Sequence, residues 1–128
     1  MERIVIFNKN IENIEGENVF DISNSTIFGN PFTLGKTNRR KNLYHVKDEN
    51  EGLEWYEAYF DRCYMADETF RNAFDTLFVA YLKYETIYLG MHRIQQDSFD
   101  YSPIIKKKLI SRSLKSKVDE IKSDQDAS

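Results

Sequence analysis

The sequence has only one cysteine and two prolines among its 128 residues, and it has no long hydrophobic run. The single cysteine, Cys63, excludes an internal disulfide and a four-cysteine zinc site. Because no apolar stretch approaches the ~20 residues that a membrane-spanning helix needs, we expect no membrane partner. We also expect no secretory leader, and therefore a cytoplasmic location.

The sequence also lacks a surplus of positive charge. It has 18 Lys and Arg against 21 Asp and Glu, a formal net charge of −3 and a pI near 5.4. Proteins that bind duplex DNA usually carry a basic surplus, so a nucleic-acid partner is not expected. The charges are segregated, with nine acidic residues between 48 and 75 and six basic residues between 106 and 117. These stretches are expected to meet, within one molecule or between two, unless the basic one binds a phosphate.

The chain is 41% hydrophobic and 14% aromatic, which suits one folded domain with a real core. Short β-branched or apolar runs predict strands at residues 3–7, 19–22, 43–46 and 86–89. Apolar residues at three- and four-residue spacing predict helices at residues 51–64, 68–83 and 102–118. Asp67 is the expected N-cap of the second helix, and Ser102 caps the third helix before Pro103. The third helix is expected to have one apolar side, formed by Ile105, Leu109, Ile110, Leu114 and Val118.

This order of elements predicts a small single-domain α/β fold. About three helices would cover a short sheet that is mixed or partly parallel. Residues 1–118 would form the domain, and residues 119–128 a flexible polar C-terminal tail.

The segment Phe28-Gly29-Asn30-Pro31-Phe32 predicts a fixed backbone turn. Gly29 is able to adopt positive φ, and Pro31 restricts both its own φ and the conformation of Asn30. A rigid turn of this kind presents backbone N–H groups to a small anionic or amide ligand. The alternative is a purely structural turn.

Ligands of parallel sheets bind beyond the carboxyl ends of the strands. Two loops are expected there, at residues 23–32 and 90–102. The second contains His92 and Arg93, an imidazole beside a guanidinium, which suits a nucleotide phosphate. A basic loop after the turn contains Arg39 and Arg40, which also match phosphate oxygens. For all these polar residues, solvated loops are the alternative. The candidate ligand-binding residues are Asn24, Gly29, Asn30, Phe32, Arg39, Arg40, His92 and Arg93.

The sequence gives little support for metal binding or for nucleophilic catalysis. The possible metal ligands are scattered, without HxxxH or CxxC spacing, so neither a metal nor another cofactor is expected. Cys63 lies on the apolar stripe of a predicted helix, and no catalytic residue is assigned. The basic run at Lys106–Lys108 opposes the dipole of the helix that it begins. We expect the acidic helix, rather than a bound anion, to neutralise it.

The chain resembles an uncharacterised domain family that is common in bacteriophages and bacteria. Its motifs are close to IGRPSxxGNPF, then a strand ending in LxCWC, then CHGD before a final helix. Residues 22–32 match the first motif at its GNPF end, residues 88–93 stand at the second, and residues 100–103 stand at the third. The resemblance covers roughly residues 3–115. It implies a fold and a site location, but no reaction.

This chain departs from the family motifs at positions where the family has an arginine, cysteines and a histidine. Asn24 stands in place of the arginine of the first motif. Met91 and Arg93 replace the cysteine pair, and Asp100 and Tyr101 replace the cysteine and histidine of CHGD. Any thiol or metal chemistry of the family is therefore absent or rewired in this chain.

Three functions follow as hypotheses. The first is a phage-type domain that binds a nucleotide or related phosphorylated small molecule without catalysis, for sequestering or sensing. One wall would be formed by Asn24, Gly29, Asn30 and Phe32. His92 and Arg93 would form the other wall, and Arg39 or Arg40 would close on the phosphate. The second is a protein-interaction module, such as an inhibitor of a host protein or a homodimer. The third is a nucleotide-processing hydrolase, which requires convergent carboxylates from Asp21, Asp97 and Asp100.

Overall fold

Three parallel strands form the main sheet of the protein, in the order β1-β5-β2. The computed structural model describes residues 3–34, 44–92 and 98–126. The strands of this sheet are β1 (Ile4–Asn8), β2 (Val19–Asp21) and β5 (Ile87–Met91). β5 lies at the centre of the sheet, and it confirms the strand predicted at residues 86–89, although it continues through Gly90 to Met91.

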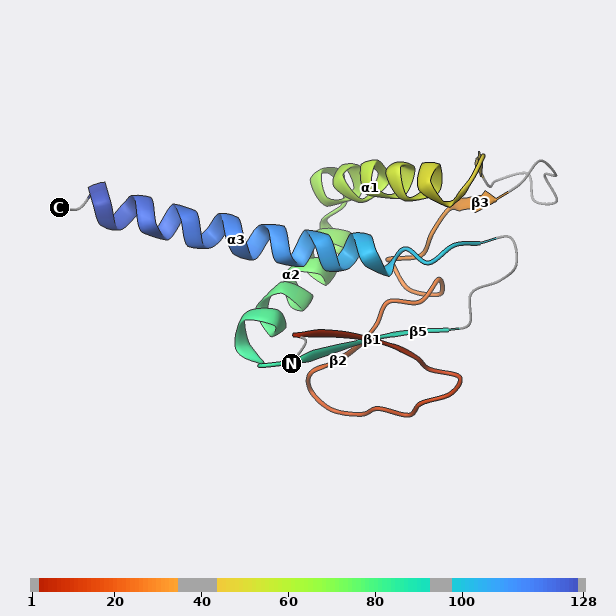
Figure 1. Ribbon diagram of the computed structural model, residues 1–128, viewed down its shortest axis with the longest axis horizontal. Helices are drawn as coiled ribbons and strands as arrows, with labels where there is room; N and C mark the ends of the chain where they lie inside the picture. The colour runs from red at the N-terminus through yellow and green to blue at the C-terminus, as the bar shows by residue number, and fades with distance from the viewer. Residues whose placement is uncertain (1–2, 35–43, 93–97, 127–128) are drawn as a thin grey trace.

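A second, two-stranded parallel sheet pairs β3 (Phe32–Leu34) with β4 (Tyr44–Val46). The sequence analysis predicts β4 but not β3. Three helices complete the fold, and they are α1 (Glu49–Ala66), α2 (Glu68–Lys83) and α3 (Ser102–Asp126). In Figure 1 the helices lie on one side of the main sheet, and the connection from β1 to β2 lies on the other side. The protein is therefore a small α/β domain, as predicted.

Two aspartates set the boundaries of the first two helices. The side chain of Asp48 accepts a hydrogen bond from the backbone N–H of Glu51 and caps α1. Asp67 ends α1 and also caps α2, because its carboxylate accepts from the N–H groups of Thr69 and Phe70. This confirms the predicted cap and explains why α1 and α2 follow one another with a single residue between them.

Aromatic side chains from α1 and α2 form the centre of the core. Phe60 of α1 packs edge-to-face against Phe70 and Phe74 of α2, with ring centroids 4.9 Å and 5.1 Å apart. Phe28, from the loop after β2, packs against Phe70 at 5.4 Å. The same core thus holds the two helices and the loop that carries the GNPF segment.

The last helix differs from its prediction in three ways. Its first N–H group, on Ser102, is capped by the side chain of Asp100, and Ser102 itself is buried. Ile105 and Leu109 are buried, but Ile110, Leu114 and Val118 are exposed, so these five residues do not share one face. The helix also continues to Asp126, beyond the predicted end at residue 118.

Ion pairs between α1 and α3 confirm that the acidic helix neutralises the basic run. Lys107 Nζ lies 2.9 Å from Glu57 Oε1, and Lys108 Nζ lies 3.0 Å from Glu57 Oε2 and 2.8 Å from Asp61 Oδ1. Hydrogen bonds from Lys107 and Lys108 lower the pKa of Glu57. Exposed pairs of this kind contribute little stability, but they offset the unfavourable charge at the start of α3.

Two buried tyrosines fasten the loop after β2 to the helical layer. Tyr56 of α1 donates its hydroxyl to the carbonyl of Phe28 at 2.7 Å, and Tyr101 donates to the carbonyl of Ile22 at 2.6 Å. Their rings stack with centroids 4.8 Å apart. We call this pair, Tyr56 and Tyr101, the tyrosine clamp. It holds both ends of a loop that extends from the sheet edge to the GNPF segment.

The tyrosine clamp leads to a stability prediction. We expect Tyr56→Phe to lower the free energy of unfolding by about 1–3 kcal/mol, because the buried carbonyl of Phe28 loses its partner. The control is Tyr84→Phe, whose hydroxyl bonds to Glu17 at an exposed position. That change should cost less than about 0.5 kcal/mol. Urea unfolding of both variants tests this, and equal costs would contradict the clamp.

Candidate functional site

The carboxyl ends of all three parallel strands meet at one edge of the main sheet. β1 ends at Asn8, β2 at Asp21 and β5 at Met91. The segments that follow these ends are joined by backbone hydrogen bonds, from Lys9 N to Met91 O and from Ile22 N to Gly90 O. We call this place the carboxyl edge. Both loops that the sequence analysis selected begin here.

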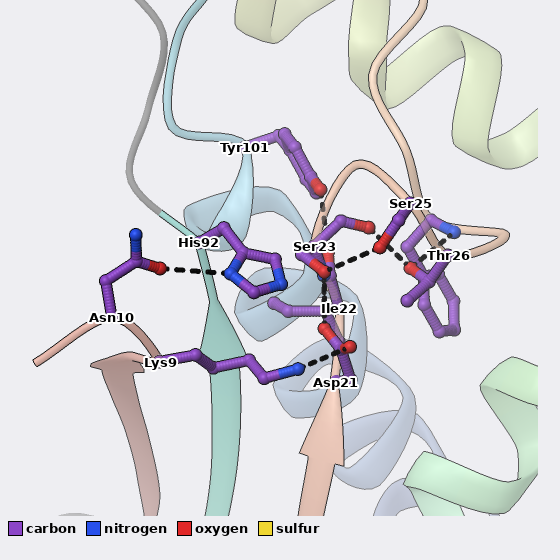
Figure 2. A network of polar contacts seen from close by, with 10 residues as sticks. Lys9, Asn10, Asp21, Ile22, Ser23, Ser25, Thr26, His92 and Tyr101 are labelled. Atoms are coloured by element: carbon purple, nitrogen blue, oxygen red, sulfur yellow. Dashed lines mark hydrogen bonds and ion pairs between the residues drawn. The ribbon is translucent and has the colours of Figure 1, made fainter. Parts of the chain in front are cut away.

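A connected set of polar side chains lies at the carboxyl edge (Figure 2). Lys9 Nζ is 2.7 Å from Asp21 Oδ2. The other carboxylate oxygen of Asp21 accepts from the N–H and the hydroxyl of Ser23, at 3.0 Å and 2.5 Å. The Ser23 hydroxyl is in turn 3.2 Å from that of Ser25. The network therefore links the residue after β1 to the loop after β2.

The charge state of Asp21 reflects this network. Partial burial opposes ionisation, but hydrogen bonds from Lys9 and Ser23, together with the positive charge of Lys9, outweigh it and lower the pKa of Asp21. Asp21 is thus a carboxylate held by a cation and a hydroxyl, an arrangement that orients Lys9 and Ser23.

His92 lies directly beyond β5 and is exposed. Its Nδ1 atom is 3.0 Å from Oδ1 of Asn10, and Figure 2 shows the ring between Asn10 and the Lys9–Asp21 pair. An amide oxygen only accepts, so this contact is a hydrogen bond when Nδ1 carries a proton, and Nε2 has no hydrogen-bond partner among the described residues. The structure therefore places His92 at the predicted edge.

The loop after β2 uses its polar side chains mainly to order its own backbone. Asn24 Oδ1 accepts from the N–H of Asn30 at 2.9 Å, and Asn30 Oδ1 accepts from the N–H of Phe32 at 3.0 Å. Thr26 bonds through both its N–H and its hydroxyl to the carbonyl of Ser23. Nδ2 of Asn30 is buried and has no hydrogen-bond partner among the described residues.

Gly29 and Phe32 have structural roles in this loop. The predicted positive φ at Gly29 is wrong, since only Gly16 among the described residues has one. Glycine is required there for another reason, because an added Cβ would lie 2.4 Å from the carbonyl oxygen of Asn24. Phe32 is buried, and its ring packs edge-to-face against Trp55 at 5.6 Å and Tyr59 at 6.0 Å.

The structure thus places His92 at the carboxyl edge, and the loop that contains Asn24, Gly29 and Asn30 begins at the same edge. Three predicted residues, Arg39, Arg40 and Arg93, lie outside the described residues. Four residues at the carboxyl edge are missing from the predicted set, and they are Lys9, Asn10, Ser23 and Ser25. The signal for the first two was the polar Asn8-Lys9-Asn10 run directly after a predicted strand.

The described surface includes a small hollow and a larger groove. The small hollow, of about 220 Å³, lies beside the carboxyl edge, with apolar walls from Phe7, Ile14 and Phe20 and polar groups from Lys9 and Asp21. The larger groove, of about 820 Å³, follows α1, away from this edge, and is lined mainly by the apolar parts of a set of residues that includes Phe32, Trp55, Tyr59 and Met65. The lining of the α1 groove also includes the charged residues Glu54, Asp61 and Arg62, but of the two only the small hollow adjoins the carboxyl ends of the strands of the main sheet.

Metal-ion and membrane features are absent from the part of the chain that the structure describes. No group of three His, Cys, Asp or Glu side chains in residues 3–34, 44–92 and 98–126 is placed to hold a metal ion. None of the described helices combines the length and apolar character needed to cross a membrane.

No family model, curated protein or solved structure matches the chain. The resemblance to the phage and bacterial domain family therefore stays a prediction.

The ion pair at the carboxyl edge predicts a pH dependence. Because the folded pKa of Asp21 is lowered below its ordinary value of 3.8, its stabilising contribution is complete above that value. The contribution is lost as pH falls through the lowered folded pKa. We expect an NMR titration to show this lowered pKa, and Lys9→Met to raise it. A wild-type pKa of Asp21 at or above 3.8 would contradict the network.

The close approach at Gly29 predicts a steric effect. Gly29→Ala should lower the free energy of unfolding by about 1–3 kcal/mol, because the new methyl group displaces the backbone at Asn24. The control is Asn13→Ala, at an exposed position of the β1–β2 connection, with an expected effect within about 0.5 kcal/mol. Thermal and urea unfolding measure both, and a neutral Gly29→Ala would show that the turn adapts.

Proposed function

We propose that the protein binds a nucleotide or a related phosphorylated small molecule at the carboxyl edge, without catalysis, to sequester or sense it. The observation that carries this proposal is the polar network at the ends of three parallel strands. Open α/β sheets bind ligands in this position, because loops from several strands converge there on one small volume.

The phosphate would lie between Lys9, Ser25 and His92. The ammonium group of Lys9 has three donors, and its ion pair with Asp21 leaves others for a ligand. The hydroxyl of Ser25 and Nε2 of His92 are further polar groups at the same edge. In this proposal Arg39 or Arg40, with Arg93, supplies guanidinium groups that match phosphate oxygens.

The base of the nucleotide would occupy the small hollow beside Lys9. Phe7, Ile14 and Phe20 offer apolar surface there, next to the charged pair of Lys9 and Asp21. Glu12 and Asn13 also line this hollow, so its walls combine apolar surface with groups that can form hydrogen bonds to a base. Asn24 and Asn30 would act indirectly, by fixing the loop that presents Ser23 and Ser25.

A nucleotide-processing hydrolase is a weaker alternative. Its catalysis would need carboxylates that are free to act as an acid, a base or a metal ligand. Asp21 is engaged by Lys9 and Ser23, and Asp100 caps α3. Asp97 lies outside the described residues.

A protein-interaction role is the second candidate, and the α1 groove favours it. Trp55 is 42% exposed and Met65 is 80% exposed along this groove, beside the ring of Tyr59. Exposed apolar surface of this kind is typical of sites that contact another protein, such as a host enzyme. A finding that no nucleotide binds at the carboxyl edge would not contradict the protein-interaction role.

The proposal predicts a specific thermal shift. We would measure thermal unfolding of the full chain with a panel of nucleotides, cyclic nucleotides and dinucleotide derivatives. A ligand at about one hundred times its Kd should raise the Tm by roughly 10 °C, because it binds only the folded state. His92→Ala and Ser25→Ala should reduce this shift.

The matched control is Lys83→Ala, which removes an exposed cation at the C-terminal end of α2, far from the carboxyl edge. Its ligand-induced shift should equal that of the wild type. A panel without any shift at millimolar ligand would overturn the nucleotide proposal. A shift that His92→Ala and Ser25→Ala leave unchanged would locate the site elsewhere.

A further inference from the structure

The outer face of α3 carries a stripe of exposed apolar side chains. Ile110 is 37% exposed, Leu114 57%, Val118 54% and Ile121 58%. At ~100° per residue these positions fall within roughly 80° of one another around the helix. Ile105 and Leu109, which are buried against the domain, lie on the opposite side. We call Ile110, Leu114, Val118 and Ile121 the outer stripe.

Most of the outer stripe lies on a part of α3 that projects from the domain. Every residue from Leu114 to Lys122 is exposed, and Figure 1 shows this half of the helix extending past the ends of α1 and α2. A helical segment of this length is marginally stable alone in water. A continuous row of large apolar residues on it is typical of a helix that packs against a partner.

The charges of α3 are divided along its length. Six basic residues lie between positions 106 and 117. The end of the helix is acidic, with Asp119, Glu120, Asp124 and Asp126 against the single basic residue Lys122. The helix is thus basic in its first half and acidic in its last turns, so it is complementary to a reversed copy of itself.

We propose that two copies of the protein pair through α3 in antiparallel orientation. The outer stripe has spacings of four, four and three residues, which is nearly the same when read backwards. In a two-fold antiparallel pair, Ile110 therefore faces the partner's Ile121, and Leu114 faces the partner's Val118. Such an interface is closed, because each copy contributes the same surface.

Charge selects the orientation of this pair. Antiparallel packing lays Lys106 and Lys107, which flank the outer stripe, along the acidic last turns of the other copy, whereas Lys108 and Arg112 face the domain. Parallel packing would lay the six basic residues against their own copies, which costs free energy. Lys107, Lys108 and Arg112 already have acidic partners within the domain, so their ion pairs alone do not require a dimer. The reason for proposing a dimer is the row of exposed apolar side chains in the outer stripe.

This inference is independent of the nucleotide proposal, because the outer stripe and the carboxyl edge share no residue. We would measure sedimentation of the full chain between about 1 and 500 µM, a range that brackets the weak affinity expected of a small helix–helix interface. A reversible dimer is expected. Leu114→Glu should raise the dimer Kd at least ~30-fold, because it places a charge in the apolar contact.

The matched control is Leu82→Glu. Leu82 of α2 is 56% exposed, almost as much as Leu114, but it does not belong to the outer stripe. This variant should dimerise like the wild type. A wild-type protein that remains monomeric at 500 µM would overturn the proposal, and so would equal weakening by both variants.

Crosslinking tests the orientation. Ile110→Cys and Ile121→Cys are prepared separately in a Cys63→Ala background, mixed, and oxidised, and the linked peptides are identified by mass. Antiparallel pairing predicts 110–121 links between copies. Links of 110 to 110 and of 121 to 121 indicate a parallel pair, and they would overturn the antiparallel arrangement even if a dimer forms.

Discussion

The tyrosine clamp is the interaction on which the arrangement of the molecule depends. Tyr56 and Tyr101 come from segments far apart in the sequence, yet their rings stack and their hydroxyls bond to carbonyls at the two ends of one loop. Burial raises the pKa of both tyrosines, so their hydroxyls remain protonated donors. The clamp thereby joins α1, the start of α3 and the edge of the main sheet.

A loop fixed at both ends can hold polar groups in place without a ligand. Asp21 and Ser23 lie immediately beside the Ile22 carbonyl that Tyr101 holds, and Lys9 reaches the same carboxylate from β1. A site ordered in this way loses less conformational freedom when it binds. In the proposed function, the edge would gain affinity from the fixed positions of its polar groups, even though the Lys9–Asp21 ion pair is exposed and weak.

The sequence was a good guide to elements with strong local signals. Asp67 and the apolar stripe after it predicted α2, and the apolar run at residues 86–89 predicted β5. β3 was missed because three residues after a proline carry no usable periodicity. In α3 the apolar residues belong to two opposite faces, and only packing separates Leu109 from Leu114. The position of the carboxyl edge could be predicted from the sequence. The presence of Lys9 there could not, because it follows from the β1-β5-β2 strand order.

The order of the main sheet has a consequence for how the chain folds. β1 and β2 are synthesised first, but each pairs with β5 and not with the other. Neither strand can complete its hydrogen bonds until the segment up to Met91 is available, so the sheet cannot assemble stepwise from its N-terminus. Contacts between residues so distant in sequence slow folding. During synthesis the helices α1 and α2 are therefore expected to form before the sheet that they cover.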